Sequence, residues 1–270
     1  MAQNIYDNKD FFDNYVQLDR QTKGLEGAPE WPQLRAMLPA DLRGLHLLDL
    51  GCGMGWVCRW ALENGAASAH GVDLSQNMLA KAHEMGSTLS CSRSATYEQA
   101  DLDSLSLPPD KYDIVFSSLA FHYLLNLPQL MAQISRALRA GGRLVFSVEH
   151  PIFTAPHDIF AAPLKAGMRT DDTTGRRYWP VDAYQHEGQR LRSWFVDGVR
   201  KQHRTMATYI RILLDEGFEL TDCVEWCPSA EELEAAPEWA SEMIRPTFLL
   251  VGATMKGQGK ICESIAKVSI

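Results

Sequence analysis

The sequence predicts an α/β protein built on a Rossmann-like, seven-stranded, mostly parallel sheet with helices on both faces. From about residue 45 the chain alternates short β-rich runs with helical runs, which is the pattern of parallel βαβ units. A glycine-rich turn at 49–55 (DLGCGMG) joins the first β-rich run to the first helical run. A hydrophobic content of 46% in 270 residues is enough for one large core.

The elements follow from apolar runs and from the residues that begin or end helices. The β-rich runs predict strands at 45–50, 69–73, 96–100, 112–117, 143–148, near 218–224 and near 247–254. Helical runs lie at 55–64, 75–84, about 128–138, and between Thr205 and Gly217. Ser75 and Thr205 can cap the helices that follow them. In the last of these helices, one apolar face is expected to consist of Met206, Ile210, Leu213 and Leu214.

We expect a single domain, 1–270, in which two segments lie outside the alternation. Its expected parts are an N-terminal helical cap (1–44), a cofactor-binding core (45–150), a substrate lid inserted after strand five (151–202), the completion of the sheet (203–256) and a tail (257–270). Gly141-Gly142 is expected to turn the chain into strand five at residue 143. Within the lid, Asp197-Gly198 predicts a hairpin turn between 192–196 and 199–202.

Composition excludes several classes of partner. The net charge is −8 and no run of lysines or arginines occurs, so a nucleic-acid surface is not expected. The six cysteines are scattered and form no CxxC pair, which favours reduced thiols and no metal site. The start of the chain lacks the order of a signal peptide, and no apolar stretch reaches the ~20 residues of a membrane span. We therefore expect a cytoplasmic protein that does not enter membranes.

The glycine-rich turn is the strongest functional signal. Glycines at 51, 53 and 55 allow the backbone to approach a ligand closely. A nucleotide-dependent oxidoreductase also carries glycines here, but the GxGxxG spacing counted from Gly51 would put the third glycine at Trp56. An indole there opposes a pyrophosphate, so the oxidoreductase is kept as the alternative. A glycine-rich turn that binds no ligand is the competing interpretation, which the strand-turn-helix context disfavours.

An acidic residue ends the second predicted strand. The carboxylate of Asp73 could accept hydrogen bonds from both hydroxyls of a ribose and would repel a 2′-phosphate. Leu74 and Met78 follow it and could pack against a nucleoside. A solvated acid or a helix cap is the competing interpretation of Asp73, although Ser75 is the better cap.

With these residues in place, the chain resembles the class I S-adenosylmethionine-dependent methyltransferases, particularly the small-molecule branch related to quinone-biosynthesis enzymes. The resemblance covers about 45–150 and implies S-adenosylmethionine as cofactor. It places Gly51 and Gly53 against the methionine part of the cofactor. It also implies adenine contacts at Asp101 and Leu102, a position near the amino end of the cofactor for Ser117, and Tyr15 closing over the methionine moiety. Tyr15 could equally be an ordinary aromatic on a helix face.

The implied reaction is an in-line methyl transfer to an O, N or C atom of a small molecule. A hydroxyl or carbon acid would need a base, whereas a neutral amine needs only alignment. His122 and His150 follow strands four and five at the ligand-binding edge and are the candidate bases; each could instead only pack or hydrogen-bond. His203 is a weaker candidate. The acceptor is expected beneath the 151–202 lid, whose aromatics and arginines could bind it or form a small core of their own.

Two further expectations complete the sequence-based interpretation. The protein is expected to act as a monomer or a homodimer. A non-catalytic protein that binds S-adenosylmethionine remains a third possibility beside the methyltransferase and the oxidoreductase.

Overall fold

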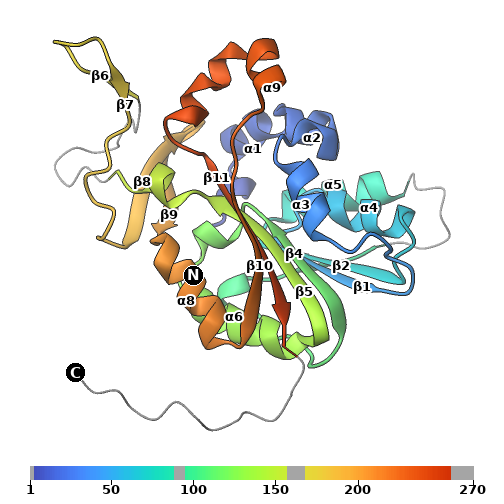
Figure 1. Cartoon of the computed structure of the whole chain (residues 1–270). Helices are drawn as coiled ribbons and strands as arrows, with labels where there is room; N and C mark the ends of the chain where they lie inside the picture. Colours follow the sequence, from blue (N-terminus) through green and yellow to red (C-terminus); the bar gives the residue numbers. More distant parts are fainter. Residues whose placement is uncertain (1–2, 88–94, 157–167, 257–270) are drawn as a thin grey trace, which may run out of the picture.

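A seven-stranded sheet forms the centre of the computed structural model, which describes residues 3–87, 95–156 and 168–256 (Figure 1). The strand order is β10-β11-β5-β4-β1-β2-β3. The strands are β1 (His46–Leu50), β2 (Ser68–Asp73), β3 (Thr96–Gln99), β4 (Tyr112–Ser118), β5 (Leu138–Glu149), β10 (Phe218–Glu225) and β11 (Phe248–Met255). In this sheet β11 runs opposite to the other six strands, so the expected mostly parallel, seven-stranded sheet is confirmed.

The strand order places one edge of the sheet where ligands bind. Strand β1 pairs in parallel with β2 on one side and with β4 on the other, so the chain reverses its direction of travel across the sheet at β1. Because parallel strands end at the same edge, Leu50, Asp73, Ser118 and Glu149 close one edge together. Ligands of open α/β sheets bind at such a reversal, beyond the carboxyl ends of the strands.

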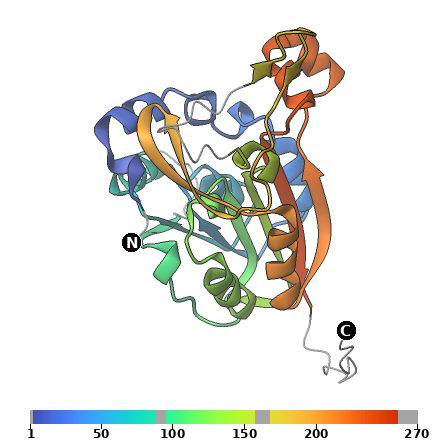
Figure 2. The same ribbon diagram turned by 90° about the vertical axis from the view of Figure 1, so that its left-hand side faces the viewer.

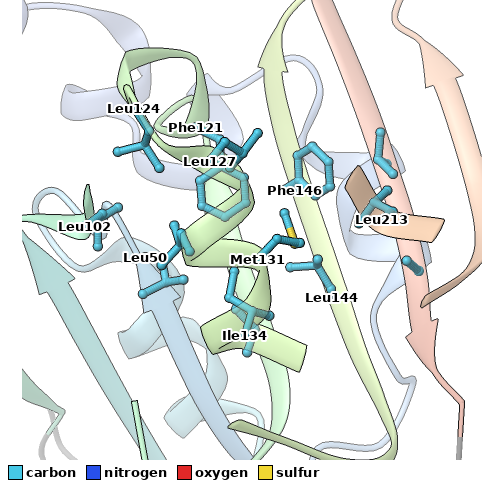
Figure 3. Packing of buried hydrophobic residues seen from close by; sticks show 14 of the residues in the cluster. Leu50, Leu102, Phe121, Leu124, Leu127, Met131, Ile134, Leu144, Phe146 and Leu213 are labelled. Atoms are coloured by element: carbon cyan, nitrogen blue, oxygen red, sulfur yellow. The ribbon is translucent and has the colours of Figure 1, made fainter. Parts of the chain in front are cut away.

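Helices cover both faces of the sheet, and each face has its own core. On one face lie α3 (Trp31–Met37), α4 (Trp56–Glu63) and α5 (Gln76–Gly86); on the other lie α6 (Leu127–Ala137) and α8 (Met206–Asp215). Figure 3 shows the second core, in which Leu127, Met131 and Ile134 of α6 face Leu144 and Phe146 of β5. These residues are almost fully buried, and the 3–4 spacing along α6 explains why they share one face.

The expected helix caps are confirmed, but the predicted apolar face of α8 (Met206–Asp215) is wrong. Ser75 Oγ accepts the backbone N–H of Met78 (3.1 Å), and Thr205 Oγ1 accepts that of Thr208 (3.2 Å). In α8 the buried residues are Tyr209 and Leu213, whereas Leu214 is 54% exposed. Residues four apart share a helix face, so burial of 209 and 213 turns residue 214 toward solvent.

Strand β5 begins earlier than the sequence predicts. It starts at Leu138, which pairs with Tyr112, and the next pair joins Arg143 to Ile114. The residues between these two pairs bulge out of the strand, and Gly141 adopts φ +76° within them. The glycine pair is therefore an irregularity inside β5 and not the turn before it.

Short helices from the N-terminus and a hairpin from the second half of the chain lie above the ligand-binding edge. The N-terminal elements are η1 (Ile5–Asp7), α1 (Lys9–Tyr15), α2 (Asp19–Thr22) and η2 (Gly24–Gly27). The hairpin joins β8 (Gly188–Trp194) to β9 (Val196–His203) and arches beside the N-terminal helices in Figure 2. The rings of Phe11 and Trp194 lie 5.2 Å apart and hold the two segments together.

The hairpin turn lies before the Asp197-Gly198 pair that the sequence predicts, at Phe195. Trp194 pairs with Val196, so Phe195 makes the turn, at φ +58°, and Asp197-Gly198 falls in a bulge within β9. The rings of Trp194 and Phe195 stack at 5.1 Å, and Phe11 packs against both. This aromatic packing outweighs the local preference of an Asp-Gly pair for a turn.

The remaining elements are short. They are η3 (Leu102–Ser104), η4 (Phe121–Tyr123), α7 (Pro151–Thr154), β6 (Arg169–Thr170), β7 (Arg177–Tyr178), α9 (Ala230–Ala235) and η5 (Pro237–Met243). Part of the expected lid, 157–167, and the expected tail, 257–270, lie outside the described residues. No helix of the described ranges is long and apolar enough to cross a membrane.

Candidate active site

The glycine-rich turn follows β1 and has a backbone conformation that requires glycine. Gly51 and Gly53 have φ of +75° and +52°. The N–H groups of Gly51 and Cys52 both donate to the carbonyl of Val72, at 2.8 and 3.1 Å. A Cβ on Gly51 would lie 2.4 Å from the Cβ of Ala120. Glycine is therefore required at position 51 for two reasons: its φ is positive, and a side chain there would collide with Ala120 in the loop after β4.

A first cavity, of about 100 Å³, opens beside this turn. We call it the acidic cavity; its lining residues are Gln3, Asn4, Tyr6, Tyr15, Gly51, Gly53, Asp73, Leu74, Met78, Asp101, Leu102, Ser118, Leu119, Ala120, Tyr123 and Leu124. Of the residues expected to bind the cofactor, all except Ser117 are in this set. The structure thus brings together residues from β2, β4, α5, the start of η3 and the N-terminal helices around one space.

Two carboxylates set the electrostatics of the acidic cavity. Asp73 Oδ2 accepts the N–H of Gly53 and Oδ1 accepts the N–H of Ser75, both at 2.8 Å. Burial raises the pKa of Asp73, and these two N–H donors oppose the rise. Asp101 Oδ1 accepts the N–H of Asp103 (3.0 Å) at the start of η3. Among the described residues lining this cavity none is Lys or Arg, so it suits a cationic or neutral ligand better than a pyrophosphate.

Ser117 lies behind the cavity wall. It is fully buried, and its hydroxyl donates to the carbonyl of Leu50 (2.7 Å), where it ties β4 to β1. Its neighbour Ser118 lines the acidic cavity instead. Successive side chains of a strand point to opposite sides, so placing Ser118 at the cavity turns Ser117 away from it.

The N-terminal segment is fixed to α5 by Asp7. Its Oδ1 accepts the hydroxyl of Ser75 (2.6 Å) and the N–H of Asn77 (3.0 Å), and its Oδ2 accepts the N–H of Gln76 (3.2 Å). The helix N-terminus favours this negative charge. These N–H and hydroxyl donors hold the pKa of Asp7 below its usual value, although burial opposes that change.

A second cavity, of about 550 Å³, adjoins the first. We call it the basic cavity; it is lined by Tyr6, Tyr15, Leu18, Arg20, Leu119, His122, Tyr123, Glu149, Phe153, Arg192, Ser193, Trp194, Lys201, Thr247 and Phe248. Tyr6, Tyr15, Leu119 and Tyr123 line both cavities. The Tyr6 and Tyr15 rings meet edge to face at 4.9 Å, and the Tyr6 and Tyr123 hydroxyls lie 3.2 Å apart. The two spaces thus share an aromatic wall.

His122 faces the basic cavity as a hydrogen-bond donor. Its Nδ1 accepts the backbone N–H of Glu149 (3.3 Å). A backbone N–H can only donate, so Nδ1 carries no proton and the neutral ring holds its proton on Nε2. Burial lowers the pKa of His122 to about 4, which keeps the ring neutral near pH 7. The sequence predicted a base at this position, whereas this tautomer presents an N–H.

His150 and His203 lie in neither cavity. His150 Nδ1 accepts the N–H of Ile152 (3.0 Å) and so caps α7, while its Nε2 lies 2.9 Å from Glu225 Oε1. His203 contacts Thr154 Oγ1 through Nδ1 (2.7 Å) and the carbonyl of Tyr184 through Nε2 (2.9 Å). Both rings hold backbone segments in place, which is the structural role left open for them on sequence grounds.

The sequence analysis missed several residues of the shared wall and of the basic cavity. Tyr6 and Tyr123 belong to no motif. They are 117 residues apart in the sequence, and only the fold brings their hydroxyls together. Lys201 forms an ion pair with Glu149, and both side chains are nearly buried. Only the enrichment of 151–202 in aromatics and arginines indicated a binding role for that region. No group of three His, Cys, Asp or Glu in the described ranges could hold a metal ion.

Comparisons with known proteins agree with this geometry. The family described as "Methyltransferase domain" matches residues 48–146. The crystal structure of an S-adenosylmethionine-dependent methyltransferase from Mesorhizobium loti is 47% identical, with a TM-score of 0.77, and the match covers 86% of this chain and 100% of that chain. A putative S-adenosylmethionine-dependent methyltransferase from Listeria monocytogenes is 38% identical, with a TM-score of 0.72, over 85% of this chain and 99% of that chain.

Part of the chain also matches enzymes whose names state a substrate. The malonyl-[acyl-carrier protein] O-methyltransferase of Enterobacter lignolyticus is 35% identical over 42% of this chain and 42% of its own length. The chain therefore spans less than half of that relative.

Proposed function

We propose that this chain, which belongs to the S-adenosylmethionine-dependent methyltransferases, transfers the methyl group of S-adenosylmethionine to a small molecule bound in the basic cavity. The enzyme class and the cofactor follow from the full-length relatives. The observation that supports the acceptor site is the aromatic wall shared by two adjoining cavities of different charge. The larger cavity has the volume of a small-molecule site.

The acidic cavity is the proposed place of the cofactor. Its lining supports Asp73 as the acceptor for the ribose hydroxyls and Asp101 with Leu102 as the adenine contacts. Leu74 and Met78 supply apolar surface beside the nucleoside. The fit rests on two features of the chain: glycines at positive φ that leave room at the turn, and carboxylates without a neighbouring cation in the lining.

The methionine part of the cofactor is proposed to lie along Gly51 and Gly53, with Tyr15 over it. Ser118, which lines the acidic cavity, is better placed than Ser117 to reach the amino end. S-adenosylmethionine, when bound, supplies a methyl group on a sulfonium that needs no further activation. A negatively charged lining suits that positive charge.

The residues of the chain then have three tasks. The wall of Tyr6, Tyr15 and Tyr123 brings the two cavities together and excludes water from their junction. His122 donates from Nε2 to the acceptor. The β8–β9 hairpin covers the basic cavity and supplies Arg192 and Lys201 to its lining.

The narrower resemblance to quinone-biosynthesis enzymes stays a prediction, as do the cytoplasmic location and the monomeric or dimeric state. One relative of named substrate is a malonyl-[acyl-carrier protein] O-methyltransferase, and another, from Arabidopsis thaliana, is a phosphoethanolamine N-methyltransferase; both names are compatible with a small acceptor group here. An oxidoreductase is disfavoured because a pyrophosphate would have to lie against Asp73 and Asp101 in a lining without Lys or Arg among the described residues.

The test uses cofactor carrying a labelled methyl group, incubated with the enzyme and a metabolite extract. We expect label in a compound of low molecular mass, and a thermal midpoint that S-adenosylhomocysteine raises and NAD does not. Label found only in macromolecules of the extract would refute the small-molecule acceptor. A midpoint raised by NAD alone would refute the cofactor site.

A further inference from the structure

The hairpin over the basic cavity buries positive charge in a chain whose net charge is −8. Its buried cations, together with the residue that follows β9, are Arg190, Arg192, Lys201 and Arg204. Burying a charge is costly unless it is paired, so an accumulation of buried cations in an acidic protein requires an explanation. Arg192 and Lys201 also line the basic cavity, as does Arg20.

Two of the three cations lining the basic cavity already have a carboxylate partner. Lys201 pairs with Glu149, and Arg20 Nη2 lies 3.0 Å from Glu30 Oε1. Lys201 also lies 4.8 Å from the ring of Trp194. The charges of these two residues are therefore balanced within the protein.

Among the three cations lining the basic cavity, Arg192 is the one without an ion pair in the described part of the chain. Its guanidinium donates to the backbone carbonyls of Leu191 (3.1 Å), Thr154 (2.9 Å) and Pro156 (2.7 Å). These acceptors are neutral, and no ion pair joins Arg192 to a carboxylate within the described residues. Burial lowers the pKa of Arg192, while the charges of Glu149 and Asp182 act in the opposite direction. The side chain is only 8% exposed.

We propose, on the basis of the function proposed above, that the acceptor is a small molecule bearing one carboxylate, which pairs with Arg192 in the basic cavity. One cavity-lining guanidinium without an ion pair suits the single negative charge of a carboxylate, whereas a phosphate monoester brings −1.5 to −2. His122 lines the same cavity, and its Nε2–H would be a further donor there. Phe153, Trp194 and Phe248 offer apolar surface to the rest of the molecule. A cationic amine would be repelled by Arg192.

The first experiment identifies the charge of the acceptor without knowing its structure. A metabolite extract is separated on an anion exchanger at pH 7, and each fraction is incubated with enzyme and methyl-labelled cofactor. We expect the acceptor in the retained fraction, resistant to phosphatase and destroyed when carbodiimide and an amine convert carboxylates to amides. Acceptor activity in the unretained fraction, or its loss after phosphatase, would overturn the inference.

The second experiment tests Arg192 with a matched control. Arg192→Gln should raise the KM for the retained acceptor at least about tenfold, the range for a lost charge-assisted hydrogen bond, and Arg192→Lys should recover part of it. Arg190→Gln is the control, because Arg190 is buried in the same strand and donates to backbone carbonyls but lines neither cavity. Its KM should stay near that of the wild type.

The affinity for S-adenosylhomocysteine separates the possible failures. Equal KM values in Arg192→Gln and the wild type, with that affinity intact, would overturn the role of Arg192 and leave the methyltransferase standing. An equal rise in KM for Arg190→Gln and Arg192→Gln would show a structural effect of the hairpin and would also overturn it. Failure of the wild type to bind S-adenosylhomocysteine or to label any small molecule would refute the proposed function itself.

Discussion

Replacing His122 by Asn should remove an acid-dependent loss of stability. Burial lowers the pKa of His122 to about 4, against 6.5 for an ordinary histidine. In the unfolded chain the ring therefore takes up its proton first as the pH falls, so stability declines from about pH 6.5 down to about pH 4. The two values correspond to about 3 kcal/mol at most. His122 is 2% exposed, so solvent screens little of this effect.

The Asn side chain is the suitable replacement because its Oδ1 can accept the N–H of Glu149, as Nδ1 of His122 does. The assay is urea denaturation of the wild type and His122→Asn at pH 7.5 and pH 4.5. At pH 4.5 the wild type should have lost about 2 kcal/mol more of its unfolding free energy than the variant has. Comparing the two proteins cancels the titration of all other groups.

Parallel stability curves over this pH range would refute the reasoning. They would mean that His122 gains its proton equally in the folded and the unfolded chain, and that burial does not keep the ring neutral in the folded protein. A steeper loss in the variant would likewise contradict it.

Three further predictions concern the acidic cavity and the buried end of β1 beside it. Asp73→Asn should weaken S-adenosylhomocysteine binding in calorimetry about tenfold or more, because a charge-assisted acceptor is lost; unchanged affinity would remove Asp73 from the cofactor site. Gly51→Ala should destabilise the fold by about 1–2 kcal/mol from its positive φ alone and further by contact with Ala120, and Ala120→Gly should recover the second part; strictly additive unfolding energies would contradict the contact. Burial, with the charge of Asp73, raises the pKa of Asp49 to about 8, so the folded protein holds that proton and loses stability as the pH rises from about 4 to about 8; Asp49→Asn should lose less over that range in urea denaturation.

The parts of the site that depend on neighbouring residues were predictable from the sequence. The turn at 49–55 and the caps at Ser75 and Thr205 are local, because each capping hydroxyl meets a backbone N–H three residues ahead. The acid at the end of β2 follows from the strand pattern. A strand's end, its glycines and its next helix are all specified within about twenty residues of sequence.

The parts that depend on distant segments were not predictable. The tautomer of His122 is set by the backbone N–H of Glu149, and the lack of an ion pair at Arg192 becomes visible only beside the pair of Lys201 with Glu149. The hairpin turn moved to Phe195 because aromatic packing across the fold outweighs a local turn preference. Ser117 was expected at the cavity, and one residue of strand register separates it from Ser118.

The attachment of Asp7 to the start of α5 has a kinetic consequence. Tyr6, the residue before Asp7, forms part of the wall of both cavities. A ligand that leaves past the N-terminal segment can therefore do so only after that segment has moved away. When the segment lifts, the N–H groups of Gln76 and Asn77 lose their hydrogen bonds to Asp7 and are left to bond with water. We therefore expect the carboxylate of Asp7 to govern residence time, and thereby turnover, more than equilibrium occupancy.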